Sequence, residues 1–200
     1  MELSKDNILT RAAVLLFSKR PTRFNMLAVC KIGRFSGNSD VDLITDDVVS
    51  GPLYRMSDKI MELLLGKYFT KTYIYQGLQR VETLVYPESS LREAILNAVI
   101  HRDYSGNSFF YIKIFDESIE LWNEGVLMEP LTIKALYEKH SSRRRNPIIA
   151  EIFYRSGQIE AWGRGSLKMI QNAKKKEESL PLHSILLKMV YLCTLEKVIL

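Results

Sequence analysis

The sequence predicts an α+β fold in which helices cover one face of a mixed, mostly antiparallel sheet. Apolar residues recur at helical spacing over 88–104, which predicts one amphipathic helix. A second such pattern predicts a long helix over 51–68. Alternating residues over 109–115 and 119–122, separated by a tight turn, predict a β-hairpin. Helices and paired strands in one short chain indicate two packed layers.

Composition sets the outer limits of function. The chain has 200 residues, of which 46% are hydrophobic and 26% charged, as in ordinary soluble globular proteins. Its formal net charge of +5 allows a nucleic-acid partner without requiring one. Cys30 and Cys193 are too far apart to indicate a zinc site or a disulfide framework. No apolar run approaches the ~20 residues that span a bilayer, so a cytoplasmic protein without a membrane partner is expected.

The first quarter of the chain predicts a helix, a strand and a loop. A short helix is expected over 9–17, and the alternation over 26–32 is typical of a strand. Residues 33–50 are polar, glycine-bearing and acidic, which predicts a loop. Only a short strand at 41–44 is expected inside that loop.

Short strands and helices are expected on either side of the hairpin. Before the helix over 88–104, residues 73–75 and 81–86 are typical of strands. After the hairpin, a short helix is expected over 131–140, and Pro147 suits the first position of another helix capped by Asn146. Further expectations are a helix over 166–176 and one or two strands in the apolar tail 180–200.

Polar residues on the helix over 88–104 are the first functional signal. Glu93, Asn97 and His101 are spaced four residues apart, so their side chains lie on one face of the helix. A glutamate can take a proton from water, and an asparagine offers a neutral oxygen to a hard cation. The alternative is that the three residues are simply the solvated face of an amphipathic helix.

Several separated motifs resemble a known family. They are Arg92 to Tyr104, His140 to Ser142 with Arg145 to Pro147, and Glu160 to Gly165. In this order they resemble the RecG-like C-terminal HATPase module of the GHKL class, over roughly residue 86 to the late 170s. The resemblance implies a two-layer Bergerat sandwich that binds ATP and Mg²⁺. In bacterial and archaeal proteins classed as transcriptional regulators, this module commonly follows a Schlafen AlbA-like domain.

The opening third resembles the closing half of such an AlbA-like domain. The matching stretches are Leu9 to Phe17, Arg34 to Gly37 and Gly51 to Leu53. The resemblance implies a partial AlbA-like α/β segment at 1–50, a linker helix and strand at 51–80, and the HATPase-like domain at 81–200. The front half of the AlbA-like domain is not in the chain, so either a longer protein has been cut or the gene is truncated. DNA would then be met through parts of the full-length protein that are absent here.

The resemblance also implies roles for individual residues. Glu93 would act as the general base, and Asn97 would hold the metal ion and bridge it to the phosphates. The remaining residues expected to bind nucleotide are His101, Arg102, Asn123, Gly125, Arg145, Gly163 and Gly165. For Arg102 and Asp103 the alternative is a local ion pair that closes the end of the helix. Arg145 belongs to a run of three arginines that is alternatively a solvated or nucleic-acid-attracting face.

One position departs from the general class. Asn123 stands where the class has an aspartate that accepts a hydrogen bond from the amine of adenine. An asparagine accepts only through its amide oxygen, and its NH2 group needs an acceptor of its own. Leu127 replaces the second glycine of the same motif. Adenine selectivity therefore does not follow from the sequence.

Three functions are compatible with these residues. The first is a nucleotide-binding regulatory module, with ATP as its expected ligand, in a DNA-associated transcriptional regulator. The second is a degenerate, non-enzymatic module kept for scaffolding or for formation of a homodimer, and the third is a weak ATPase. Helicase activity is not expected, because the sequence contains no G-x-x-x-x-G-K-[ST] loop.

Overall fold

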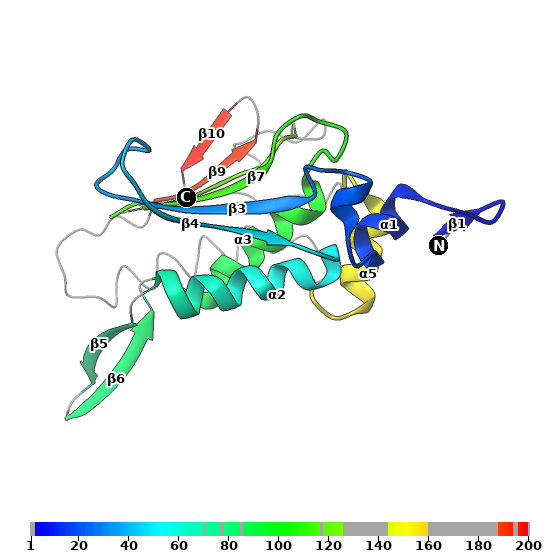
Figure 1. The fold of residues 1–200 in the computed structure, drawn as a ribbon. Coiled ribbons are helices and arrows are strands. Elements are labelled where there is room, and N and C mark those ends of the chain that lie inside the picture. The colour runs from blue at the N-terminus through cyan, green and yellow to red at the C-terminus, as the bar shows by residue number, and fades with distance from the viewer. Residues whose placement is uncertain are drawn as a thin grey trace.

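The computed structural model describes residues 3–69, 71–76, 78–84, 86–116, 118–125, 144–159, 188–193 and 196–199. These residues form two layers, a twisted sheet and a layer of helices against one of its faces (Figure 1). The expected α+β fold with helices on one face of a mixed sheet is therefore confirmed.

Within the described ranges, the main sheet has six strands in the order β10-β9-β8-β7-β3-β4. Neighbouring strands are antiparallel except for the pairs β3–β7 and β8–β9, which are parallel. The strands are β3 (Val29–Phe35), β4 (Leu43–Ser50), β7 (Phe110–Ile114), β8 (Ser118–Trp122), β9 (Lys188–Cys193) and β10 (Glu196–Ile199). Both the hairpin and the strands of the tail are thus present, as the sequence predicts.

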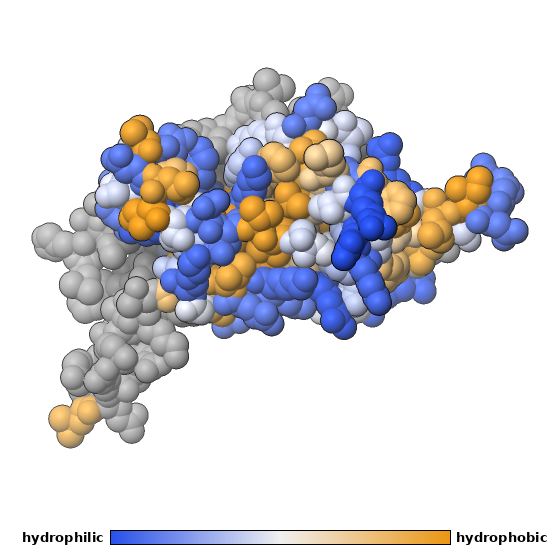
Figure 2. Space-filling view, viewed as in Figure 1, coloured by the Kyte–Doolittle hydropathy of each residue, from blue (hydrophilic) through white to orange (hydrophobic). Residues whose placement is uncertain are grey.

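The prediction of a loop over 33–50 is wrong. β3 continues to Phe35, and β4 is a full strand of eight residues that pairs with it. β4 lies at the edge of the sheet, and most of its residues are exposed, so hydrophilic and hydrophobic residues lie side by side on the surface seen in Figure 2. An exposed edge strand needs no apolar alternation, and acidic side chains there discourage unwanted pairing with other strands. The polar and acidic residues of 33–50 therefore led to the prediction of a loop where the chain forms a strand.

The helices follow the sequence pattern closely. Thr10 caps α1 (Arg11–Phe17) by accepting a hydrogen bond from the Ala13 amide at 3.2 Å. The remaining helices are α2 (Leu53–Leu63) with its π-helical extension η2 (Leu64–Tyr68), α3 (Glu88–His101), α5 (Pro147–Arg155) and the short 3₁₀ helix η1 (Pro21–Arg23).

Two small hairpins lie outside the main sheet. β5 (Lys71–Gln76) and β6 (Gln79–Leu84) pair as a separate antiparallel ribbon, which Figure 1 shows projecting away from the sheet beyond the end of α2. β1 (Ser4–Lys5) and β2 (Ile8–Leu9) form a second ribbon near the N-terminus. The strands expected around 73–75 and 81–86 are therefore confirmed.

A single hydrophobic core joins the early and late parts of the chain. Ile32 of β3, Ile112 of β7 and Leu121 of β8 are fully buried in the same cluster as α2 and α3. β3 lies between β4 and β7, so residues 29–50 belong to the main sheet. The divisions expected after residues 50 and 80 stay predictions.

Some expectations fall outside the described residues. They are the helices over 131–140 and 166–176 and the glycines Gly163 and Gly165. Among the helices that the structure describes, none has the length and apolar character needed to cross a membrane.

Candidate functional site

α3 presents a short polar stripe beside its buried face. Leu91, Ile95 and Val99 are buried, whereas Glu93 and Asn97 are only partly covered. The Asn97 Nδ2 atom donates a hydrogen bond to Glu93 Oε1 at 3.1 Å. The structure therefore brings the expected base and the expected metal ligand into contact. Because the amide nitrogen of Asn97 serves Glu93, its amide oxygen is the atom that suits a cation or water.

His101 lies one turn further along the same stripe and is a neutral residue. Burial, reinforced by the positive charges of Arg145 and Arg144, lowers the pKa of the imidazole from 6.5 to about 4. At neutral pH the ring is therefore uncharged, so it could offer a hydrogen bond to a ligand but no positive charge. Charge for a phosphate would have to come from the neighbouring arginines.

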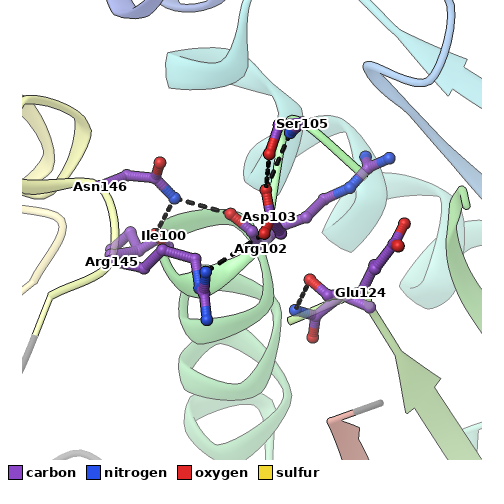
Figure 3. Close-up of polar contacts among 8 residues, drawn as sticks. Ile100, Arg102, Asp103, Ser105, Glu124, Arg145 and Asn146 are labelled. Carbon is purple, nitrogen blue, oxygen red and sulfur yellow. Dashed lines mark hydrogen bonds and ion pairs between the residues drawn. The ribbon is translucent and has the colours of Figure 1, made fainter. Parts of the chain in front are cut away.

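The end of α3 is closed by Asn146. Its Nδ2 atom donates to the carbonyl oxygens of Ile100, at 2.8 Å, and Arg102, at 2.7 Å (Figure 3). These are carbonyls that a helix end leaves without intrahelical partners. Asn146 is the N-cap residue of α5, as expected, but its side chain makes no capping hydrogen bond to that helix. Pro147 does occupy the first turn of α5, as expected.

Arg145 binds the same end of α3. Its Nη1 atom lies 3.2 Å from Asp103 Oδ2 (Figure 3). Asp103 Oδ1 also accepts hydrogen bonds from the hydroxyl and amide of Ser105, which, with Arg145, hold the pKa of this carboxyl below its usual value. Asp103 thus pairs with Arg145 rather than with Arg102, and residues 145–146 are fastened to α3 by two adjacent side chains.

Gly125 follows β8 and passes close to the same helix end. Its φ of +151° is a conformation that favours glycine. A Cβ atom at this position would lie 3.2 Å from the His101 carbonyl oxygen and 3.6 Å from Arg145 Nε. The close approach of three chain segments is therefore the reason for a glycine here, and it brings Gly125, His101 and Arg145 together.

Asn123 continues the buried face of β8. Ile119 and Leu121 point to the helical layer, and Asn123, two residues on, is likewise 0% exposed. Its Nδ2 atom donates a long hydrogen bond of 3.4 Å to the Glu124 carbonyl oxygen, which also accepts from the Asp103 amide at 2.7 Å. Its Oδ1 atom is buried and has no hydrogen-bond partner among the residues that the structure describes.

A buried acceptor without a partner costs about 1–3 kcal/mol relative to a satisfied one. The Glu124 carbonyl orients the amide of Asn123 so that the oxygen is the open end. A ligand that donates a hydrogen bond to this oxygen would recover the cost. Asn123 therefore offers the same kind of atom, an oxygen acceptor, as an aspartate at this position would.

Arg102 is not brought to the polar stripe. It is 2% exposed, and its guanidinium donates to the carbonyl oxygens of Ser108, at 2.6 Å, and Val29, at 3.4 Å. It also lies over the ring of Tyr104, whose hydroxyl donates to the Val99 carbonyl at 2.7 Å. These contacts tie the segment after α3 to β3. Arg102 therefore has a structural role there, although the expected ion pair with Asp103 is wrong, because Asp103 pairs with Arg145.

Sequence reasoning missed Glu124. Its carboxylate accepts a hydrogen bond from the Ser108 amide at 2.7 Å, and a Cβ at Gly106 would collide with this carboxylate. The turn at 105–108 therefore holds Glu124, which in turn presents the carbonyl that orients Asn123. Gly106, in a short polar turn directly after α3, indicates a close approach by another group. The sequence does not show that this group is the carboxylate of Glu124.

Comparison with known proteins supports the resemblance over part of the chain. Residues 108–189 match the family model described as "Putative ATP-dependent DNA helicase recG C-terminal". This range holds Asn123, Gly125 and Arg145 and begins after α3. No curated protein matches the chain.

A solved structure shares the fold. The crystal structure of the DIP2311 protein from Corynebacterium diphtheriae superposes with a TM-score of 0.67 at 19% sequence identity. The match covers 82% of this chain and 32% of that protein, so the chain spans about a third of its length. At this identity the likeness establishes the fold alone. It includes residues outside the range of the family model, since 82% of the chain is aligned.

Proposed function

We propose that this chain is a nucleotide-binding regulatory module that takes ATP together with Mg²⁺. The observation that carries the proposal is the buried Oδ1 atom of Asn123, which has no hydrogen-bond partner within the described part of the chain. An exocyclic amine, as in adenine, is the donor that such an acceptor needs, whereas guanine presents an oxygen at the corresponding position. Asn123 would therefore select the base, in the role that the family resemblance implies.

The metal ion would have only one protein ligand among the residues that the structure describes. The described residues contain no group of three or more His, Cys, Asp or Glu side chains suited to a metal ion. Mg²⁺ commonly keeps several waters and binds through one or two protein oxygens plus the phosphates of its substrate. Asn97 Oδ1 fits this pattern as a single neutral ligand, because Nδ2 is committed to Glu93. When bound, the ion would neutralise phosphate charge.

Glu93 suits the role of general base for water. Its carboxylate is partly exposed and is held by Asn97, so the base would stand beside the metal ligand. Arg145 and His101 lie at the far end of the same stripe. Arg145 would supply positive charge to phosphates only by sharing its guanidinium between them and Asp103. Binding is therefore supported by more observations than hydrolysis.

The setting of the module is proposed from the family description. The matched family is named for a DNA helicase, and the structurally similar protein is about three times as long as the aligned region. We infer a module whose bound nucleotide biases the arrangement of neighbouring domains in a DNA-associated regulator. The competing proposal is a scaffold that has kept the fold without the ligand.

Calorimetric titration with ATP and a non-hydrolysable analogue, with and without Mg²⁺, tests the proposal. The unchanged chain should bind both, and Asn97→Ala should lose the Mg²⁺-dependent part. Asn123→Leu should lose binding while its free energy of unfolding stays the same or rises, because an apolar side chain removes an unsatisfied buried group. Ser39→Ala, in the exposed turn between β3 and β4, is the control and should bind normally.

Glu93→Ala separates the remaining functions. If the unchanged chain hydrolyses ATP and Glu93→Ala binds ATP without hydrolysing it, the protein is an ATPase. If the unchanged chain binds ATP but does not hydrolyse it, the protein is a regulatory module. If no nucleotide gives heat or raises the melting temperature of the unchanged chain, the scaffold is correct instead.

A further inference from the structure

The face of the sheet opposite the helices carries a row of aromatic and basic side chains. Lys31, Tyr111 and Trp122 lie directly beside one another in register on β3, β7 and β8. Their neighbours along each strand, such as Ile32, Ile112 and Leu121, are fully buried toward the helices. Successive side chains of a strand point to opposite faces, so the row lies on the outer face. The candidate nucleotide site lies on the opposite side, where Asn123, directly after β8, faces the helices.

The aromatic rings of this row are in mutual contact. The ring centroids of Tyr111 and Trp122 are 5.7 Å apart, and those of Tyr111 and Phe109 are 6.0 Å apart. The Lys31 Nζ atom stands 3.9 Å from the centroid of Phe109, as a cation over a ring. All four side chains keep part of their surface accessible. We call Lys31, Phe109, Tyr111 and Trp122 the aromatic row.

The row contains one lysine, and charges of both signs lie beside it. The Lys31 ammonium group contacts the ring of Phe109, and no ion pair of Lys31 is found within the described residues. The chain as a whole carries a net charge of +5. Lys113, two residues along β7 on the same face, pairs with Asp40 at 2.5 Å and lies across from Glu120. One accessible cation therefore belongs to the row itself, and a second stands beside it in an ion pair at the surface, where such pairs are weak.

We propose that the aromatic row binds single-stranded nucleic acid. Every base has a π-face, so side-by-side aromatic rings on a sheet stack bases with little regard to sequence, while nearby lysines meet the phosphates. In a duplex the bases already stack on one another and expose only their edges in the grooves, so a flat row of rings does not suit it. A second copy of this chain would bring another Lys31 against the first, which like charges disfavour.

Fluorescence anisotropy of labelled oligonucleotides tests this proposal with the full chain. Oligo(dT), oligo(rU) and a duplex of the same length serve as probes over a series of salt concentrations. Single strands should bind, the duplex should bind at least tenfold more weakly, and the difference between dT and rU decides whether DNA or RNA is preferred. Tyr111→Ala should weaken binding about tenfold, while Tyr111→Phe should retain it, since a stacked base contributes ~1–3 kcal/mol.

The lysine variants distinguish a site from general basic charge. Lys31→Ala should flatten the slope of log K against log salt by about 0.7, because one phosphate contact is lost. Lys19→Ala removes the same charge from an exposed position after α1 and should leave the slope unchanged. Asn123→Leu should also bind the oligonucleotides normally, so the proposal does not depend on the nucleotide site.

Three results would overturn the proposal. The first is no binding of any single strand by the unchanged chain, and the second is an equal loss of slope in both lysine variants. The third is a concentration-dependent oligomer that Tyr111→Ala abolishes, which would make the row an interface between copies. Circular dichroism spectra of Tyr111→Ala and Tyr111→Phe, compared with that of the unchanged chain, determine whether each variant is folded.

Discussion

At the scale of single residues, His101 makes the protein sensitive to mild acid. Its pKa is about 4 in the folded protein and 6.5 for the free side chain. Between these values the unfolded chain takes up a proton that the folded chain does not, so the free energy of unfolding falls as the pH falls from about 6.5 to about 4. Above pH 6.5 the effect vanishes. The loss should reach about 1–3 kcal/mol, given partial exposure.

Urea unfolding of the unchanged chain and His101→Asn between pH 4 and pH 8 checks this prediction. The variant should lose less stability over that range, and the two curves should run parallel above pH 7. The carboxyls with lowered pKa, such as Asp103, lose stability only at lower pH and do not interfere. Identical pH dependence in both chains would show that His101 titrates normally.

The candidate site could be predicted only in part at this scale. The contact between Glu93 and Asn97 followed from helical spacing, because residues four apart meet on one face. The partners of Arg102, Asn123 and Asn146 could not, because each is set by a segment distant in sequence or by the rotation of an amide. The sequence shows that these side chains are polar, but it does not show which groups they form hydrogen bonds with.

At the scale of elements, the junction at the end of α3 depends on Asn146. Asn146→Ala removes two hydrogen bonds and leaves the carbonyls of Ile100 and Arg102 without that partner. The free energy of unfolding should fall by about 1–3 kcal/mol, and Ser39→Ala, in an exposed turn, should change it by less than about 0.5 kcal/mol. Urea denaturation of both variants measures the difference, and equal stabilities would mean that water replaces the amide.

The elements themselves were predictable where burial imposes a period. The stripe of α3 and the alternation of β7 are each dictated by one buried face, and both elements form as expected. β4 was missed because its position at the sheet edge leaves most of its side chains in water. Its pairing with β3 rests on backbone hydrogen bonds, which leave no mark on the hydrophobic pattern.

At the scale of the whole molecule, the order of strands could not be read from the chain. The two parallel pairs join strands separated by long segments, and such contacts carry little local signal. The division expected after residue 50 rests on a resemblance to a family and stays a prediction, while the sheet places β3 directly beside β7.

Removing residues 1–50 tests this arrangement. The deletion takes away β3 and β4 and exposes the edge of β7, together with core residues such as Leu64 and Val99 that pack in the same cluster as Ile32. The remaining chain should show no cooperative unfolding transition and should aggregate, because an open edge and an uncovered core invite association. A control that lacks only residues 1–7 keeps Thr10 and its cap on α1 and should unfold cooperatively. Circular dichroism and size-exclusion chromatography report both outcomes, and a monomeric, cooperatively folding product of the longer deletion would show that residue 50 is a true domain boundary.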